Sequence, residues 1–174
     1  MLQQDRENRY PNLRSDGYSV TSEDTIHKKV KYNCVAWAVI GDTGKWWQSG
    51  NHPGYYWPKG IPDDDSFQSY VELFKLYDFR TRTNADVEPL SEKIAIYAYP
   101  DGEFAHVAYQ LLNGWTSKLG DWQDIKHKTL KALEGQYYGD VNLIMKRRCT
   151  LRGFLLRIAF NWTCRFWPAR RRGI

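Results

Sequence analysis

The stretch Tyr32-Asn33-Cys34-Val35-Ala36-Trp37-Ala38 predicts a short helix that begins at a cysteine. Asn33 is a favourable N-cap, and the apolar run after it continues to Ile40 and ends before Gly41. A thiol in the first turn of a helix lies near unpaired N–H groups and the positive end of the helix dipole. We therefore expect the thiolate form of Cys34 to be favoured.

A nucleophilic thiolate needs a base, and the strand-like run 104–111 carries His106. A cysteine at a helix start, followed much later by a histidine on a strand, is the order expected of a thiol hydrolase with a Cys–His pair. Cys34 and His106 are thus the candidate catalytic residues. The competing interpretation is a buried, inert cysteine together with a structural histidine.

The imidazole of His106 would need a third polar group to fix its tautomer. The residues 113–114 are Asn-Gly, a strong signal for a two-residue hairpin turn, and such a turn places Asp121 opposite His106. Ser117 would project from the same face of the hairpin as His106. His127 is a third candidate if the loop before it folds back, and the sequence leaves the three alternatives open.

Composition restricts the class of partner. The chain has 174 residues, of which 42% are apolar and 26% charged, as in ordinary globular proteins. Its net charge of +5 comes from the tail: eight of the 25 basic residues lie in 147–174, which leaves 17 basic against 20 acidic residues in 1–146. We therefore expect no nucleic-acid binding by the main domain.

Neither a disulfide framework nor a metal site is predicted. The chain has three cysteines and no Cys-x-x-Cys pair, and a zinc site from Cys34, His106 and His127 would lack a fourth ligand. We expect no metal and no cofactor. The sequence shows no signal peptide and no run of 18 apolar residues, which favours a cytoplasmic location.

The chain divides into a polar N-terminal extension (1–31), a single α+β domain (32–146) and a basic tail (147–174). A second helix is expected over 67–77, because Asp and Ser residues at 63–66 precede an apolar stripe of helical spacing. A polar loop follows at 80–92. We predict strands at 94–99, 105–112, 115–119 and 138–145, and a short helix around 125–133. The cysteine-bearing helix would pack on this small antiparallel sheet.

Between 41 and 62 the sequence is rich in aromatic residues, glycines and prolines, with no helical or strand period, which predicts a loop. Its rings could form a substrate-binding wall beside the cysteine, made by Trp46, Trp47, Tyr56 and Trp57. The alternative is a loop that only covers the core.

The tail has apolar residues at helical spacing with arginines on their flanks. This pattern over 151–172 is typical of a cationic amphipathic helix that lies on a membrane surface. The alternative is an ordinary helix that docks on the domain.

Several motifs resemble a family of small, uncharacterised, mainly bacterial proteins, a domain of unknown function. They include Tyr-Asn-Cys-Val-Ala-Trp-Ala at 32–38, His-Val-Ala-x-Gln-Leu at 106–111 and Trp-Thr-Ser-Lys-Leu-Gly-Asp at 115–121. More distantly, these motifs are similar to the NlpC/P60 branch of papain-like cysteine hydrolases. That similarity implies Cys34 as nucleophile, His106 as base and Ser117 as the orienting group, although those proteins have histidine, asparagine or glutamine where Ser117 stands.

The sequence as a whole therefore predicts a cysteine-dependent amide hydrolase or acyl-transferase with a peptide, glycopeptide or protein substrate. The alternative is a non-catalytic binding or interaction module on the same scaffold.

Overall fold

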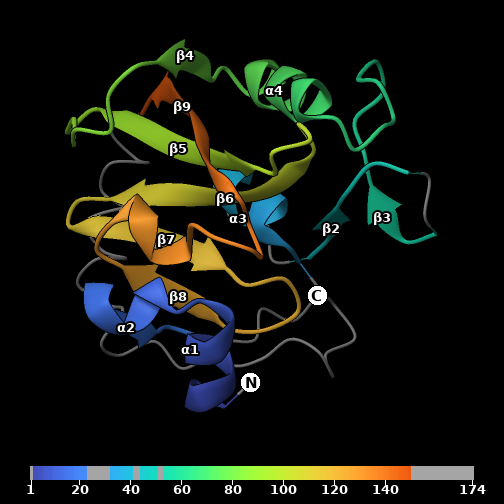
Figure 1. The fold of residues 1–174 in the computed structure, drawn as a ribbon. Helices are drawn as coiled ribbons and strands as arrows, with labels where there is room; N and C mark the ends of the chain where they lie inside the picture. The colour runs from blue at the N-terminus through green and yellow to red at the C-terminus, as the bar shows by residue number, and fades with distance from the viewer. Residues whose placement is uncertain (1, 23–31, 41–43, 51–52, 150–174) are drawn as a thin grey trace.

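A seven-stranded sheet forms the centre of the computed structural model, which describes residues 2–22, 32–40, 44–50 and 53–149 (Figure 1). Its strand order is β1-β8-β7-β6-β5-β9-β4, and every neighbouring pair is antiparallel. The strands are β1 (Tyr18–Val20), β4 (Arg80–Arg82), β5 (Ser91–Ala98), β6 (Phe104–Leu111), β7 (Gly114–Lys118), β8 (Asp124–His127) and β9 (Asp140–Arg148). A separate parallel pair joins β2 (Trp46–Trp47) and β3 (Tyr55–Tyr56).

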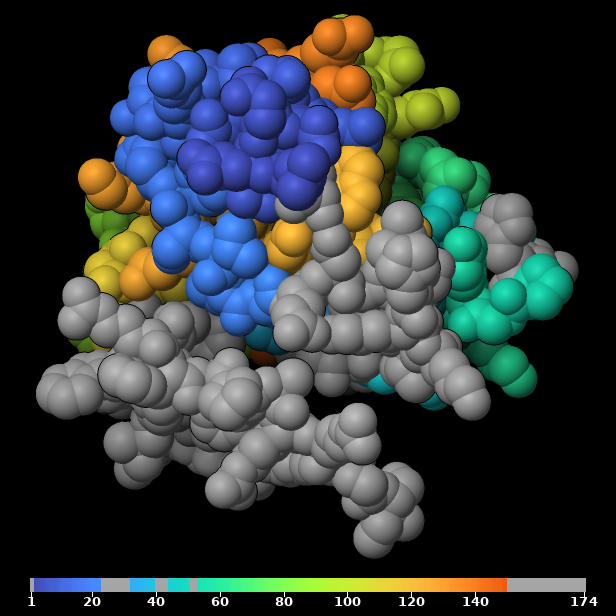
Figure 2. Space-filling model, turned by 90° about the horizontal axis from the view of Figure 1, so that it is seen from below, coloured from blue at the N-terminus to red at the C-terminus, as the bar shows by residue number. Residues whose placement is uncertain are grey.

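Each face of the sheet has its own hydrophobic cluster. On the first face, α3 (Cys34–Ile40), α4 (Phe67–Leu76) and the β2–β3 pair pack on Val107, Ile96 and Met145. Because side chains alternate along a strand, the neighbouring residues, such as Ala108 and Tyr97, point to the second face. There they lie beneath the N-terminal segment and a 3₁₀ turn. That layer contains α1 (Gln3–Arg9), α2 (Asn12–Asp16) and η1 (Leu130–Leu133), and the N-terminal helices stand out in the view from below (Figure 2). The molecule is thus mixed α and β, with a mostly antiparallel sheet and few helices.

Both helices expected from capping signals are present. The Asn33 side-chain oxygen accepts a hydrogen bond from the Ala36 N–H at 3.2 Å, as an N-cap does. In α4, the Ser66 hydroxyl accepts the Ser69 N–H at 3.2 Å. The predicted start of each helix is therefore confirmed.

The helix predicted around 125–133 is wrong. Its first part is β8, which pairs with β7 on one side and β1 on the other, so sheet hydrogen bonds outweigh any local helical preference. Only Leu130–Leu133 is helical, as a single 3₁₀ turn. The polar loop predicted at 80–92 contains β4 and the first residues of β5, and the last strand runs over 140–148.

The predicted register of the β6–β7 hairpin is also wrong. The ladder pairs Leu111 with Gly114 and Tyr109 with Thr116, so the two turn residues are 112–113 rather than 113–114. Each residue of β6 therefore pairs with a residue two positions earlier than predicted. Gly114, at φ 119°, begins β7 rather than closing the turn. The ladder ends at Tyr109–Thr116, so Asp121 is not opposite His106. A shift of two preserves the faces, so the Ser117 and His106 side chains do project from the same face.

The N-terminal extension contributes to the sheet, because β1 pairs with β8. The predicted amphipathic helix over 151–172 lies outside the described residues. Among the helices of the described ranges, none is long and apolar enough to cross a membrane.

Candidate functional site

The Cys34 thiol lies in the interior, at the first residue of α3, with 8% of the residue exposed. Its sulfur is within hydrogen-bonding reach of the backbone N–H groups of Val107, Val35 and Cys34 itself. Val107 belongs to the part of β6 that lies beyond the last β6–β7 pair. The start of α3 is therefore placed where β6 pairs with β5 but no longer with β7.

Burial raises the pKa of the Cys34 thiol to about 11. The surrounding N–H groups and the Lys118 ammonium act in the opposite direction, but desolvation is the larger effect. The expectation that the helix start favours the thiolate is wrong for this arrangement, because the thiol is protonated at neutral pH.

Lys118 is a member of this site that the sequence analysis missed. The residue is fully buried; its ammonium donates to the Trp122 carbonyl and lies 5.0 Å from the centroid of the Tyr32 ring. Strand alternation could have revealed it: in 115–118, Trp115 and Ser117 face the second cluster, so Lys118 faces α3.

His106 is buried on the second face of the sheet. It pairs with Tyr97 across β5–β6, and its ring stacks on Tyr138 with centroids 4.1 Å apart. Both ring nitrogens lack a hydrogen-bond partner among the described residues. Burial, with a smaller contribution from His127, lowers the pKa of His106 to about 3, so the imidazole is neutral.

No hydrogen bond joins Cys34 and His106. Cys34 contacts the strand at Val107, the next residue, whose side chain points to the opposite face from that of His106. A negative charge on Cys34 would nevertheless raise the pKa of Tyr138, the residue on which His106 stacks. The structure thus places the Cys34 thiol of α3 against Val107, the residue of β6 next to His106, but not in direct contact with His106.

The three candidates for orienting His106 do different things. Ser117 is 2.9 Å from Nε2 of His127, and Nδ1 of His127 is 2.7 Å from the Thr129 carbonyl. A carbonyl only accepts, so Nδ1 carries the proton and Nε2 accepts from the Ser117 hydroxyl. Burial lowers the pKa of His127 to about 4. Ser117 therefore orients His127 rather than His106, and Asp121 lies half-buried in the β7–β8 loop.

The aromatic segment lies beside the start of α3, since Asn33 hydrogen-bonds both the N–H and the carbonyl of Trp47. Trp47 is 3% exposed and belongs to the core, and Tyr56 packs against it with centroids 4.7 Å apart. Trp46 stacks on Tyr55. Of the four aromatic residues predicted to form a binding wall, Trp57 alone lines the nearby open groove.

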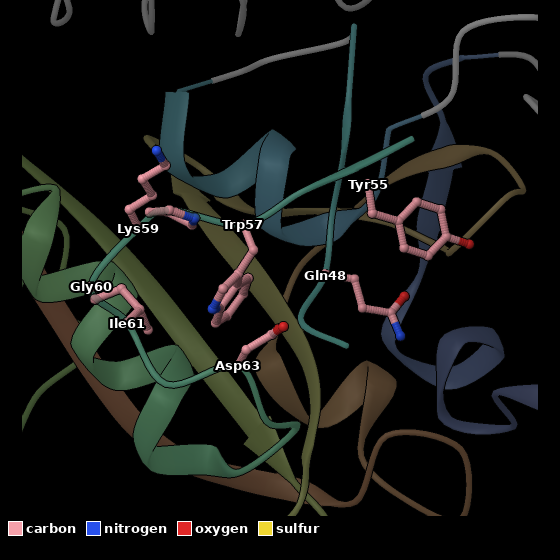
Figure 3. Close-up of a pocket in the computed structure, with 8 residues that line it drawn as sticks. Gln48, Tyr55, Trp57, Lys59, Gly60, Ile61 and Asp63 are labelled. Carbon is pink, nitrogen blue, oxygen red and sulfur yellow. The ribbon is translucent and has the colours of Figure 1, made fainter. Parts of the chain in front are cut away.

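That groove has a volume of about 310 Å³. Figure 3 shows Trp57 and Asp63 on one side of it and Gln48 and Tyr55 on the other, with Lys59 further along the same loop as Trp57. Among the described residues, no cluster of three or more His, Cys, Asp or Glu side chains could hold a metal ion.

The family model of the domain of unknown function DUF7689 matches residues 20–146 of this sequence. The chain belongs to the DUF7689 family. In this DUF7689 chain, Cys34, His106, Lys118 and the groove all fall within the matched range, and the basic tail lies outside it. No curated protein and no solved structure matches the chain.

Proposed function

We propose that this DUF7689 chain is a cysteine-dependent acyl-transfer enzyme, an amide hydrolase or acyl-transferase with a papain-like use of Cys34 and His106. The observation that carries the proposal is the buried His106 imidazole, which leaves both ring nitrogens unpartnered among the described residues, next to the strand position that meets the Cys34 thiol. Buried polar groups are nearly always paired, so such an exception calls for an explanation.

The surroundings of the thiol support the same proposal. A core that only had to pack would bury neither an unpartnered imidazole nor the Lys118 ammonium, because both cost free energy. Three backbone N–H groups and this ammonium favour negative charge on the Cys34 sulfur, and donors of this kind also stabilise the charge on a substrate oxygen. Ionisable groups of strongly shifted pKa cluster most often at functional sites.

The proposed reaction requires the neutral imidazole to leave Tyr138 and pass the side of β6 that has no β7 pairing at 106–107, so that it reaches the sulfur on the other face of the sheet. The thiol proton passes to a ring nitrogen of His106 while Sγ attacks the acyl carbon. The C–N bond then breaks, and the leaving amine takes the proton from the imidazolium. Water or a second amine finally cleaves the thioester and restores the thiol. Ser117 would act indirectly, by holding His127, and Asp121 is the candidate that would orient the turned imidazole.

Acylation by p-nitrophenyl acetate tests this proposal, in a variant in which Cys149 and Cys164 are replaced by serine. We expect a burst of p-nitrophenolate and one acetyl group on Cys34, found by mass spectrometry. Cys34→Ala should abolish both, and His106→Gln, which keeps a polar side chain of similar size, should slow acylation about 100-fold. Circular dichroism establishes that each variant is folded. A folded protein without acetyl-Cys34, or a rate that His106→Gln leaves unchanged, would contradict the proposal.

A specific observation favours a second function. Cys34 and His106 are both uncharged and buried, whereas the groove at Trp57 is open. These features suit a non-catalytic module that binds a peptide, glycopeptide or protein, with Cys34 as a packing residue. This is the outcome if the folded protein fails to be acylated.

A further inference from the structure

We infer that the groove lined by β3 and the loop from β3 to α4 binds a neutral saccharide unit through Trp57 and Tyr55. The groove is lined by their rings and by the polar side chains of Gln48, Lys59 and Asp63. This inference goes beyond the proposed function, because none of these residues belongs to the Cys34 site.

Trp57 supplies a fixed aromatic platform. Its indole N–H donates to the Pro62 carbonyl at 3.1 Å, and its ring packs edge-to-face on Tyr70 with centroids 5.1 Å apart. On the other side, Tyr55 is 43% exposed and stacks on Trp46 at 5.8 Å. Rings held in this way present flat apolar surface at little cost in conformational entropy, which suits the apolar face of a sugar ring.

The polar groups match hydroxyl groups better than a charged ligand. The Gln48 amide both donates and accepts, the Lys59 ammonium donates, and the Asp63 carboxylate accepts. A sugar hydroxyl also donates and accepts, so it can pair with each of them. Because the two charged groups are of opposite sign, the lining favours neither an anion nor a cation.

The walls of the groove are joined to each other. The Gly50 N–H donates to the Asp63 carboxylate at 2.5 Å, and the Ser49 hydroxyl donates to Asp65 at 2.5 Å. These bonds link the segment after β2 to the segment before α4, so the two sides of the groove are held at a fixed position relative to each other. The volume of about 310 Å³ is at the small end of ligand sites, which limits the ligand to one or two sugar rings.

Titration of the full chain with cellobiose, maltose and N,N′-diacetylchitobiose tests this inference, with the ¹⁵N-labelled tryptophan indole resonances as the readout. We expect at least one disaccharide to shift the Trp57 resonance, with a dissociation constant on the order of 1 mM. Tyr55→Ala should weaken this binding about fivefold or more. Tyr137→Ala is the matched control, because Tyr137 is equally exposed at 41% and packs on Tyr10 of the second cluster.

The inference is overturned if no disaccharide shifts the Trp57 resonance, or if Tyr137→Ala weakens binding as much as Tyr55→Ala does. Binding of a tri-alanine peptide with higher affinity than every sugar would also overturn it. Cys34→Ala should leave sugar binding unchanged, so the proposal of sugar binding in the groove and the proposal of acylation at Cys34 are tested independently.

Discussion

Gly139 shows how closely the backbone packs at the edge of the site. It lies at φ 63°, and a Cβ atom on it would come within 1.9 Å of the Ala98 carbonyl oxygen. The preceding residue, Tyr138, carries the ring on which His106 stacks. The approach of these two backbones therefore helps to set the position of the imidazole.

Gly139→Ala should accordingly cost far more stability than a positive φ alone. We expect a loss of roughly 3 kcal/mol or more in the free energy of unfolding, because the backbone at Ala98 must move. Gly120→Ala is the control: Gly120 has φ 55°, and its added Cβ would meet nothing within 4 Å, so only the conformational cost of about 1 kcal/mol is expected. Urea unfolding measures both, and equal losses would contradict the close approach.

Asn33 connects α3 to the aromatic segment. Its side chain caps the helix at Ala36 and holds both backbone groups of Trp47. Asn33→Ala removes the cap and both hydrogen bonds to the buried Trp47 backbone, so we expect a loss of about 2–4 kcal/mol. Ser66→Ala is the control, because it removes the cap of α4 and hydroxyl contacts with the nearby Asp64 and Ser69, all within one segment of the chain, at a cost of about 1 kcal/mol. Similar losses in thermal unfolding would show that the link to Trp47 contributes little.

Local signals explain which elements the sequence predicted correctly. Both α3 and α4 begin at polar caps followed by apolar runs, and these signals are contained within a few residues. The sequence of β8 does not reveal a strand by itself, because its strand character comes from pairing with β7 and with β1, and β1 lies far away in the sequence. The face of Ser117 was correct despite the wrong register, because alternation survives a shift of two.

The site was less predictable than the fold. Order along the chain predicts a Cys–His pair, and in the structure the Cys34 thiol of α3 meets Val107, the residue next to His106, without direct contact between the pair. Whether the Cys34 thiol is charged depends on its burial beneath other elements. The prediction of a thiolate considered only the N–H groups and the dipole at the start of the helix, not this burial. Trp47 likewise belongs to the core because of its contacts with Asn33, so the loop composition alone could not distinguish it from Trp57.

The histidine pair on the second face links protonation to the stability of the whole fold. Folding lowers the pKa of His106 to about 3 and of His127 to about 4, from the ordinary value of 6.5. The unfolded chain therefore binds protons first as the pH falls below 6.5. The stabilisation is fully present above that pH and is lost progressively towards pH 4.

We expect the free energy of unfolding to fall by on the order of 3 kcal/mol between pH 6.5 and 4.5. This window lies above the range in which Glu88 contributes, because its ion pairs with Lys93 and Lys146 hold its pKa at about 2. Urea unfolding at a series of pH values measures the loss. His106→Gln should flatten the profile within this window, and an unchanged slope would contradict the burial of a neutral imidazole.

Alkylation of Cys34 by iodoacetamide as a function of pH tests the proposed coupling between the two faces of the sheet. The protein carries serine at 149 and 164, and His106→Gln is compared with the parent. If His106 accepts the thiol proton, replacement should slow alkylation at pH 7 about tenfold or more, while the rates of the two proteins converge near pH 11, where hydroxide removes the proton. Equal rates at every pH would contradict this account and leave Cys34 as a packing residue.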